Sequence, residues 1–139
     1  MTNRLFIDSN IWVYALSGSS EERGRKARAF INAAAIDSRP VISYQVVNET
    51  MRVLKKLGKS EAGLRQFIDS LFEICEVAGF TKEAAFLASD LRETMSVSYW
   101  DSQIVASACL ANCSTLISED LPDGSLIRGS LAIKNIFNE

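Results

Sequence analysis

The stretch RLFIDSNIWVYAL, residues 4–16, joins a short apolar run to an apolar helical pattern through a single aspartate. Residues 4–8 are typical of a buried strand, and IWVYAL, which is followed by Ser17 and Gly18, is typical of a short helix. Asp8 therefore falls where the strand ends. Because an acid beside apolar residues is costly unless a charge compensates it, this position suggests a specific use for Asp8.

The rest of the chain continues the alternation of strands and helices. Apolar spacing predicts helices over residues 21–36, 45–57, 60–72, 81–95 and 101–110, and short apolar runs predict strands over 40–43, 74–79, 114–118 and 131–137. Thr81 is the expected N-cap of its helix. Parallel strands need long crossovers, so the pattern predicts an α/β fold, a three-layer α/β/α sandwich with a central parallel sheet. We expect one domain over residues 1–139, since 47% of the chain is hydrophobic.

Three further acids follow apolar runs or lie on the adjoining helices, namely Glu49, Asp101 and Asp120. The ligand crevice of an open α/β sheet lies beyond the carboxyl ends of its strands. We expect Asp8 and Asp120 there, with Glu49 and Asp101 leaning in from their helices. Each acid also has an ordinary interpretation: Asp8 and Asp101 as helix caps, Glu49 as an exposed helix acid, and Asp120 as part of the turn SEDLPDG.

A cluster of four carboxylates predicts a bound metal ion. Two carboxylates about 4 Å apart repel by roughly 4 kcal/mol at an effective dielectric constant of 20, and a hard cation relieves that repulsion. Oxygen ligands favour Mg²⁺ or Mn²⁺, and one or two such ions could activate a water for attack on a phosphodiester. Ser9, Asn10 and Ser118 could orient a carboxylate or a water, and they are equally plausible as turn residues.

The composition excludes several other kinds of chemistry. The chain has no histidine, so nucleophile systems that need an imidazole are impossible. Cys75, Cys109 and Cys113 are expected to be core thiols rather than zinc ligands or disulfide partners. With no leader-like segment and no apolar run of about 20 residues, we expect a cytoplasmic protein that does not enter a membrane.

Positive charge is concentrated in two segments although the net charge is −2. That net charge argues against a uniformly basic surface that coats nucleic acid. The two clusters could hold RNA phosphates or form solvated helix faces, and their members are Arg23, Arg25, Lys26 and Arg28, then Arg52, Lys55, Lys56 and Lys59. Trp12 and Trp100 stand beside acids and could stack on bases, although core packing is the commoner role.

Four segments together resemble the PIN domain, in the form found in the ribonuclease toxins of bacterial toxin–antitoxin pairs, the VapC type. They are FIDSNIWVYAL (6–16), ISYQVVNETMRVLKK (42–56), YWDSQIVASACLANCSTLISEDLPDG (99–124) and LAIKNIF (131–137), and the match covers nearly the whole chain. The resemblance implies an Mg²⁺- or Mn²⁺-dependent endoribonuclease whose acidic positions are Asp8, Glu49, Asp101 and Asp120. Ser9 and Asn10 match the residues after the first acid, and Ser118 matches the hydroxyl two residues before the last.

The resemblance also implies partners. Such proteins usually form homodimers and are held inactive by a small antitoxin whose tail fills the acidic groove, where an arginine would pair with the carboxylates. The fourth acidic position is open at this point, because Glu119 and Asp123 lie close to Asp120 and could substitute for it or support it.

Other functions remain open on the sequence. A PIN nuclease could process RNA without an antitoxin, and a PIN-like scaffold could bind RNA or protein without cutting. A magnesium-dependent phosphatase of flavodoxin-like architecture also gathers acids at strand ends. It is disfavoured, because the chain has no second acid two residues after Asp8 and no lysine between Lys82 and Lys134. The RNA target is not evident from the sequence.

Overall fold

The computed structural model describes residues 3–138. Within this range, six strands form one sheet in the order β3-β2-β1-β4-β6-β5. The strands are Leu5–Ile7 (β1), Val41–Ser43 (β2), Glu76–Ala78 (β3), Thr115–Ile117 (β4), Leu126–Ile127 (β5) and Leu131–Lys134 (β6). All neighbours pair in parallel except β5, which runs antiparallel to β6. The predicted α/β architecture with a central, mostly parallel sheet is confirmed.

Most of the helices begin at a side chain that caps them. They are Ser9–Leu16 (α1), Glu22–Asp37 (α2), Tyr44–Lys56 (α3), Glu61–Ile74 (α4), Lys82–Thr94 (α5) and Tyr99–Leu110 (α6), followed by the 3-10 turn Ile136–Asn138 (η1). The capping side chains are Asp8, Ser43, Ser60, Thr81 and Ser98, at α1, α3, α4, α5 and α6. Each accepts a hydrogen bond from a free N–H of the first helical turn, which fixes where the helix begins. The predicted cap at Thr81 is confirmed.

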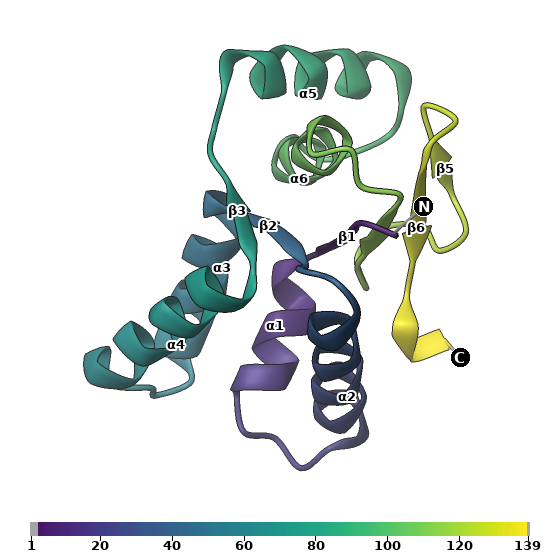
Figure 1. Cartoon of the computed structure of the whole chain (residues 1–139). Coiled ribbons are helices and arrows are strands. Elements are labelled where there is room, and N and C mark those ends of the chain that lie inside the picture. Colours follow the sequence, from purple (N-terminus) through teal and green to yellow (C-terminus); the bar gives the residue numbers. More distant parts are fainter. Residues whose placement is uncertain (1–2, 139) are drawn as a thin grey trace.

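The helices lie in two layers around the sheet (Figure 1). α5 and α6 pack together on one face, and α1 and α2 pack together on the other. α3 packs beside α1, and α4 packs against α3. The central strands are buried from both sides, so Phe6, Ile7, Leu116 and Ile117 are almost fully inaccessible. Strands covered on both faces are expected to be continuous apolar runs, as these are.

The order of the strands creates a switch point between β1 and β4. From β1 the chain passes to β2 and β3 on one side, and only then returns to place β4 on the other side of β1. Ile7 and Ile117 are register partners, and the Asp8 N–H donates to the Ile117 carbonyl at 2.9 Å. The residues that follow these two strands, Asp8 and Ser118, therefore emerge next to each other.

Two local features after β4 differ from the sequence prediction. The strand expected over 131–137 ends at Lys134, because the Asn135 side chain accepts a hydrogen bond from the Phe137 N–H and starts η1. The two-residue strand β5 was not predicted, since two residues show no periodicity.

The cysteines agree with the sequence analysis. Cys75 and Cys113 are buried, Cys109 is half-buried, and all three are free thiols, so the prediction of core thiols is confirmed. In the part of the chain that the structure describes, every helix is too short or too polar to cross a membrane.

Candidate active site

Asp8 is the most buried of the predicted acids, with 4% of its surface exposed. It follows β1 and caps α1: its Oδ1 accepts a hydrogen bond from the Ser9 N–H at 2.7 Å. Its Oδ2 accepts one from the buried Ser118 hydroxyl at 2.8 Å. Asp8 is therefore a helix cap, which was one of the roles considered from the sequence. The same two hydrogen bonds also hold its carboxylate at the switch point.

Glu49 reaches the same place from α3. Its Oε2 accepts a hydrogen bond from the Ser9 hydroxyl at 3.0 Å, and that hydroxyl also lies 3.5 Å from Asp8 Oδ1. Its Oε1 accepts one from the Gln45 amide at 2.7 Å. Ser9 therefore stands between two carboxylates, and Gln45 sets the direction of the second.

Asp101 lies in the first turn of α6. The helix begins two residues earlier than predicted, because Ser98 is the cap and accepts a hydrogen bond from the Asp101 N–H at 3.1 Å. The Gln45 amide also donates to the Trp100 carbonyl at 3.1 Å, which links α3 to the start of α6. The capping function belongs to Ser98, and the Asp101 carboxylate is available for another role.

Asp120 completes the group from the segment after β4. Its Oδ2 accepts a hydrogen bond from the Asn10 amide at 3.0 Å. Its N–H donates to the Ser118 hydroxyl at 3.2 Å, and Ser118 in turn donates to Asp8. Asn10 and Ser118 thus connect Asp120 to the first turn of α1.

Electrostatic interactions link the four acids. The pKa of Asp8 is raised to about 6, chiefly by burial; the hydrogen bonds from Ser118 and Ser9 oppose the shift, and the negative charges of Glu49 and Asp101 add to it. Burial also raises the pKa of Asp101, and Asp120 and Glu49 add to that shift. The acids predicted from the sequence therefore lie close enough together for their charges to interact.

The two alternatives for the fourth acid have other partners. Glu119 accepts hydrogen bonds from the Tyr14 hydroxyl and from Arg23, both at 2.7 Å. Asp123 accepts from the Asn135 N–H at 2.9 Å and from the Asn138 amide at 3.3 Å. The supporting role expected of Asp123 is not what its contacts indicate, because its carboxylate holds the C-terminal segment. The geometry favours Asp120.

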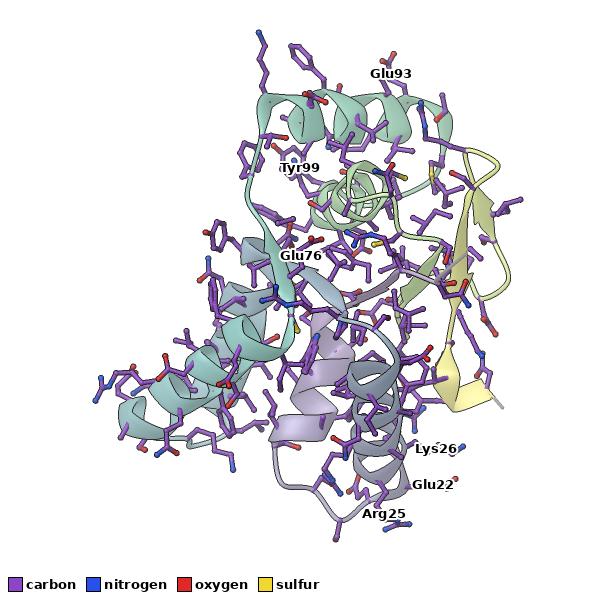
Figure 2. The ribbon with its side chains drawn as sticks, in the orientation of Figure 1. Glu22, Arg25, Lys26, Glu76, Glu93 and Tyr99 are labelled. Carbon is purple, nitrogen blue, oxygen red and sulfur yellow. The ribbon has the colours of Figure 1, made fainter. Side chains whose placement is uncertain are left out.

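The basic residues of α2 are divided between the outer end of the helix and the segment after β4. Arg25 donates to the Ser20 carbonyl, and Lys26 lies 3.4 Å from the Glu22 carboxylate. Figure 2 shows Glu22, Arg25 and Lys26 together at the outer end of α2, well apart from Tyr99 at the start of α6. Arg23 is engaged by Glu119. Of this predicted cluster, Arg25 and Lys26 lie away from the start of α6, whereas Arg23 reaches the residue next to Asp120.

The basic residues of α3 lie closer to it. Arg52 lines the same surface cavity as Glu49, one helical turn away. Lys55 forms an ion pair with Glu61 at 2.8 Å, and Lys56 is exposed at the end of the helix. Of the predicted phosphate-binding residues, Arg52 is the best placed.

Gln45 is a site residue that the sequence analysis missed. It orients Glu49 and binds the backbone beside Asp101. The available signal was its spacing: residues four apart on a helix share a face, and an amide at that distance can hydrogen-bond a carboxylate.

The donor set suits a hard metal cation. Among residues 3–138, no three acidic or thiol side chains are placed to hold an ion in their present orientations. The available ligands are carboxylate oxygens, which Mg²⁺ and Mn²⁺ prefer. The Asp8 carboxylate is buried, and the hydrogen bonds that it accepts from Ser9 and Ser118 come from neutral groups, so a cation would offset a real electrostatic cost. The chemistry of the donor set therefore fits a hard divalent ion.

Comparison with known protein families gives a clear assignment. The family model for the PIN domain matches residues 5–121, which include all four acids. The chain belongs to the PIN domain family. PIN domains are a nuclease family, so the acidic site lies in a nuclease scaffold. A search of curated proteins found no match.

Solved structures share the fold. A toxin–antitoxin complex from Klebsiella pneumoniae is 22% identical with a TM-score of 0.73, over 96% of this chain and 98% of that one. VapBC2 from Rickettsia felis, bound to promoter DNA, is 20% identical with a TM-score of 0.70, over 94% and 97%. The sarcin-ricin-loop-cleaving toxin VapC20 of Mycobacterium tuberculosis is 16% identical with a TM-score of 0.67, over 84% and 91%. These likenesses confirm the PIN fold.

Proposed function

We propose that this PIN domain is an Mg²⁺- or Mn²⁺-dependent endoribonuclease that hydrolyses RNA phosphodiesters. The observation that supports the proposal most is the gathering of Asp8, Glu49, Asp101 and Asp120 at the switch point of the sheet by the hydrogen bonds of Ser9, Ser118, Asn10 and Gln45. A pure scaffold has no need for four acids gathered at one point. The family assignment favours this nuclease over the phosphatase considered from the sequence.

We assign the four acids to metal binding and catalysis. A bound divalent ion would lower the pKa of a water and stabilise charge on the leaving oxygen. The surrounding residues orient the carboxylates: Ser118 and Ser9 hold Asp8, and Gln45 holds Glu49. Asn10 holds Asp120. In the reaction a water oxygen bonds to phosphorus, one ester P–O bond breaks, and a proton passes to the leaving oxygen.

We assign RNA phosphate binding chiefly to α3. Arg52 lies beside Glu49, and Lys56 is exposed one turn farther along the helix. Lys55 would have to release Glu61 to bind a phosphate. Arg25 and Lys26 would contact only RNA that extends to the outer end of α2. Arg23 would have to release Glu119 to bind a phosphate. Phosphate contacts of this kind position the substrate without selecting its sequence.

We further propose that the protein is a cytoplasmic toxin of the VapC type, dimeric and controlled by a small antitoxin. The similar structures from Klebsiella pneumoniae and Rickettsia felis come from toxin–antitoxin assemblies. An acidic groove offers an antitoxin arginine a charge-assisted contact. A PIN nuclease that processes RNA without an antitoxin would use the same catalytic residues.

The test is cleavage of a mixed structured RNA by the purified protein in Mg²⁺, Mn²⁺ or EDTA. The wild type should cut in either metal and stop in EDTA. Asp8→Asn and Asp101→Asn should lose the activity, because each removes a negative charge from the cluster. Asp90→Asn, which changes an exposed acid on α5, is the matched control and should cut like the wild type.

Full activity of Asp8→Asn in metal would show that the assigned site is wrong. Activity that persists in EDTA would show that the reaction does not depend on a divalent ion. Circular dichroism of every variant excludes loss of the fold as the cause.

A further inference from the structure

An open cavity of about 790 Å³ adjoins the acidic site between α3 and α6. Its lining is Tyr44, Gln45, Asn48, Glu49, Arg52, Phe80, Tyr99, Trp100 and Gln103. Glu49 belongs both to this cavity and to the acidic cluster, and Trp100 directly precedes Asp101. We call this cavity the aromatic groove. A ligand lying in it would run directly into the candidate active site.

Aromatic side chains stand exposed in the groove. Phe80 is 73% exposed, Trp100 65%, Tyr99 55% and Tyr44 51%. Large aromatic side chains gain free energy when they are buried, so a group of them left in water marks a binding surface. The other tryptophan, Trp12, is a core residue whose Nε1–H donates to the Ile7 carbonyl at 3.2 Å. The structure thus distinguishes the two tryptophans that the sequence analysis left together.

The rings of the groove are held in place before any ligand binds. The Arg92 guanidinium lies 4.4 Å from the centre of the Tyr99 ring and donates to the buried Ser102 hydroxyl at 2.7 Å. Tyr99 contacts Trp100 edge to face, with ring centres 5.2 Å apart. Figure 2 shows Tyr99 at the start of α6, beneath α5. A rigid ring loses little entropy when a flat ligand stacks on it.

The polar residues of the groove identify the ligand. Arg52 supplies a positive charge for a phosphate, and the amides of Asn48 and Gln103 can donate to or accept from the edges of bases. Aromatic faces, amides and one cation in one groove match a nucleic acid strand whose bases are unpaired. Bases inside a duplex are stacked on each other and cannot reach these rings.

We propose that the aromatic groove binds unpaired bases of single-stranded RNA next to the bond that is cut, with Trp100 and Tyr99 as the stacking platform. The proposal rests on the ribonuclease function proposed above and adds the residues that hold the nucleotides beside the cut. Arg52 holds the phosphate of the stacked nucleotide. The groove thereby positions the following phosphate beside Glu49 and Asp101.

The test measures binding separately from cleavage. A fluorescein-labelled 12-nucleotide RNA without secondary structure is titrated with Asp8→Asn protein, and with the wild type in EDTA, and anisotropy gives the Kd. The same strand annealed to its complement is the duplex probe. We expect the single strand to bind at least about tenfold more tightly than the duplex.

Variants then locate the contact. In the Asp8→Asn background, Trp100→Ala and Tyr99→Ala should each weaken single-strand binding by at least about fivefold, the lower end for loss of one stacked base. Phe86→Ala is the matched control, because Phe86 is 62% exposed on α5 outside the groove, and it should bind normally. RNA should also quench the tryptophan emission, and Trp100→Phe should abolish the quenching, since Trp12 is buried.

Unchanged affinity in Trp100→Ala and Tyr99→Ala, equal affinity for the duplex, or no binding of the single strand by either protein would each overturn the proposal. Light scattering gives the mass of each variant in the same samples. If Trp100→Ala converts a dimer to a monomer without changing RNA affinity, the groove is an interface between copies of the chain. Single-strand binding by a wild type that cannot cut RNA would instead refute the proposed function and leave the groove assignment standing.

Discussion

Asp8 combines a structural and a chemical role in one side chain. It caps α1 through one oxygen and receives the Ser118 hydroxyl at the other, while its burial disfavours the charge. The folded protein therefore binds the Asp8 proton more tightly than the unfolded chain does. Its pKa is about 6 in the folded state, against the ordinary 3.8.

This difference makes the stability of the protein depend on pH. Below about pH 4, Asp8 is protonated in both states, and the contribution of its raised pKa to stability is fully present. As the pH rises through about 6, that contribution is lost, and the total loss is roughly 3 kcal/mol. Asp8→Asn cannot ionise, and its amide can still accept from Ser9 and donate to Ser118. We expect the variant to become progressively more stable than the wild type between pH 4 and pH 7 in EDTA.

Urea unfolding of both proteins at several pH values in EDTA measures this effect. The difference in unfolding free energy should grow in favour of Asp8→Asn as the pH rises. A constant difference across the range would mean that Asp8 does not titrate as its burial indicates.

The helix α6 carries its acid into the site through its cap. The Ser98 hydroxyl accepts the Asp101 N–H at 3.1 Å, so the cap fixes the turn that presents the Asp101 carboxylate. The Ser60 hydroxyl makes the equivalent bond to the Gly63 N–H at 3.1 Å at the start of α4. Both serines cap a helix in the same way, but the Ser98 hydroxyl also hydrogen-bonds the Asp101 carboxylate, and only Ser98 adjoins a candidate catalytic residue.

Ser98→Ala and Ser60→Ala therefore form a matched pair. Each should lower the unfolding free energy by about 1 kcal/mol, the usual cost of losing a serine cap. Only Ser98→Ala should also slow RNA cleavage, because only its helix end positions a catalytic carboxylate. Thermal unfolding and cleavage rates of both variants provide the comparison. Equal cleavage rates would show that the cap of α6 does not position Asp101.

At the scale of the whole molecule, the acids are brought together by topology. Asp8 and Ser118 follow neighbouring parallel strands, and Glu49 and Asp101 enter from helices on opposite faces. An ion that binds only this folded arrangement must stabilise the entire domain. At a concentration 100-fold above its Kd, the stabilisation is about 2.7 kcal/mol.

Manganese should therefore raise the Tm of the wild type, and it should raise the Tm of Asp90→Asn equally. The rise should be much smaller for Asp8→Asn, which lacks one charged ligand. Differential scanning fluorimetry over a range of Mn²⁺ concentrations measures this directly. An equal rise in Asp8→Asn would place the ion elsewhere.

Much of this architecture could be predicted because its signals are local. The alternation of strands and helices, the cap at Thr81 and the acid after β1 are all visible within a few residues of sequence. The positions of Glu49 and Asp101 followed once a parallel sheet was assumed.

Contacts between distant residues could not be predicted. The Tyr14–Glu119 contact joins residues 105 positions apart, and nothing local distinguishes Glu119 from Asp120. The basic cluster of α2 looked as suitable for RNA as that of α3, since the sequence does not show which end of a helix lies near the site. Likewise, only the fold separates the buried Trp12 from the exposed Trp100.

The most direct test of the central claim is the chemistry of the ends produced by RNA cleavage. Wild-type protein and Asp101→Asn are incubated with one RNA in Mn²⁺, and mass spectrometry identifies the new termini. Water activated at a carboxylate site leaves no 2′,3′-cyclic phosphate, so the wild type should generate fragments free of it, and Asp101→Asn should generate none of these fragments. Cyclic phosphate ends, or the same fragments from Asp101→Asn, would contradict hydrolysis by the four-carboxylate site.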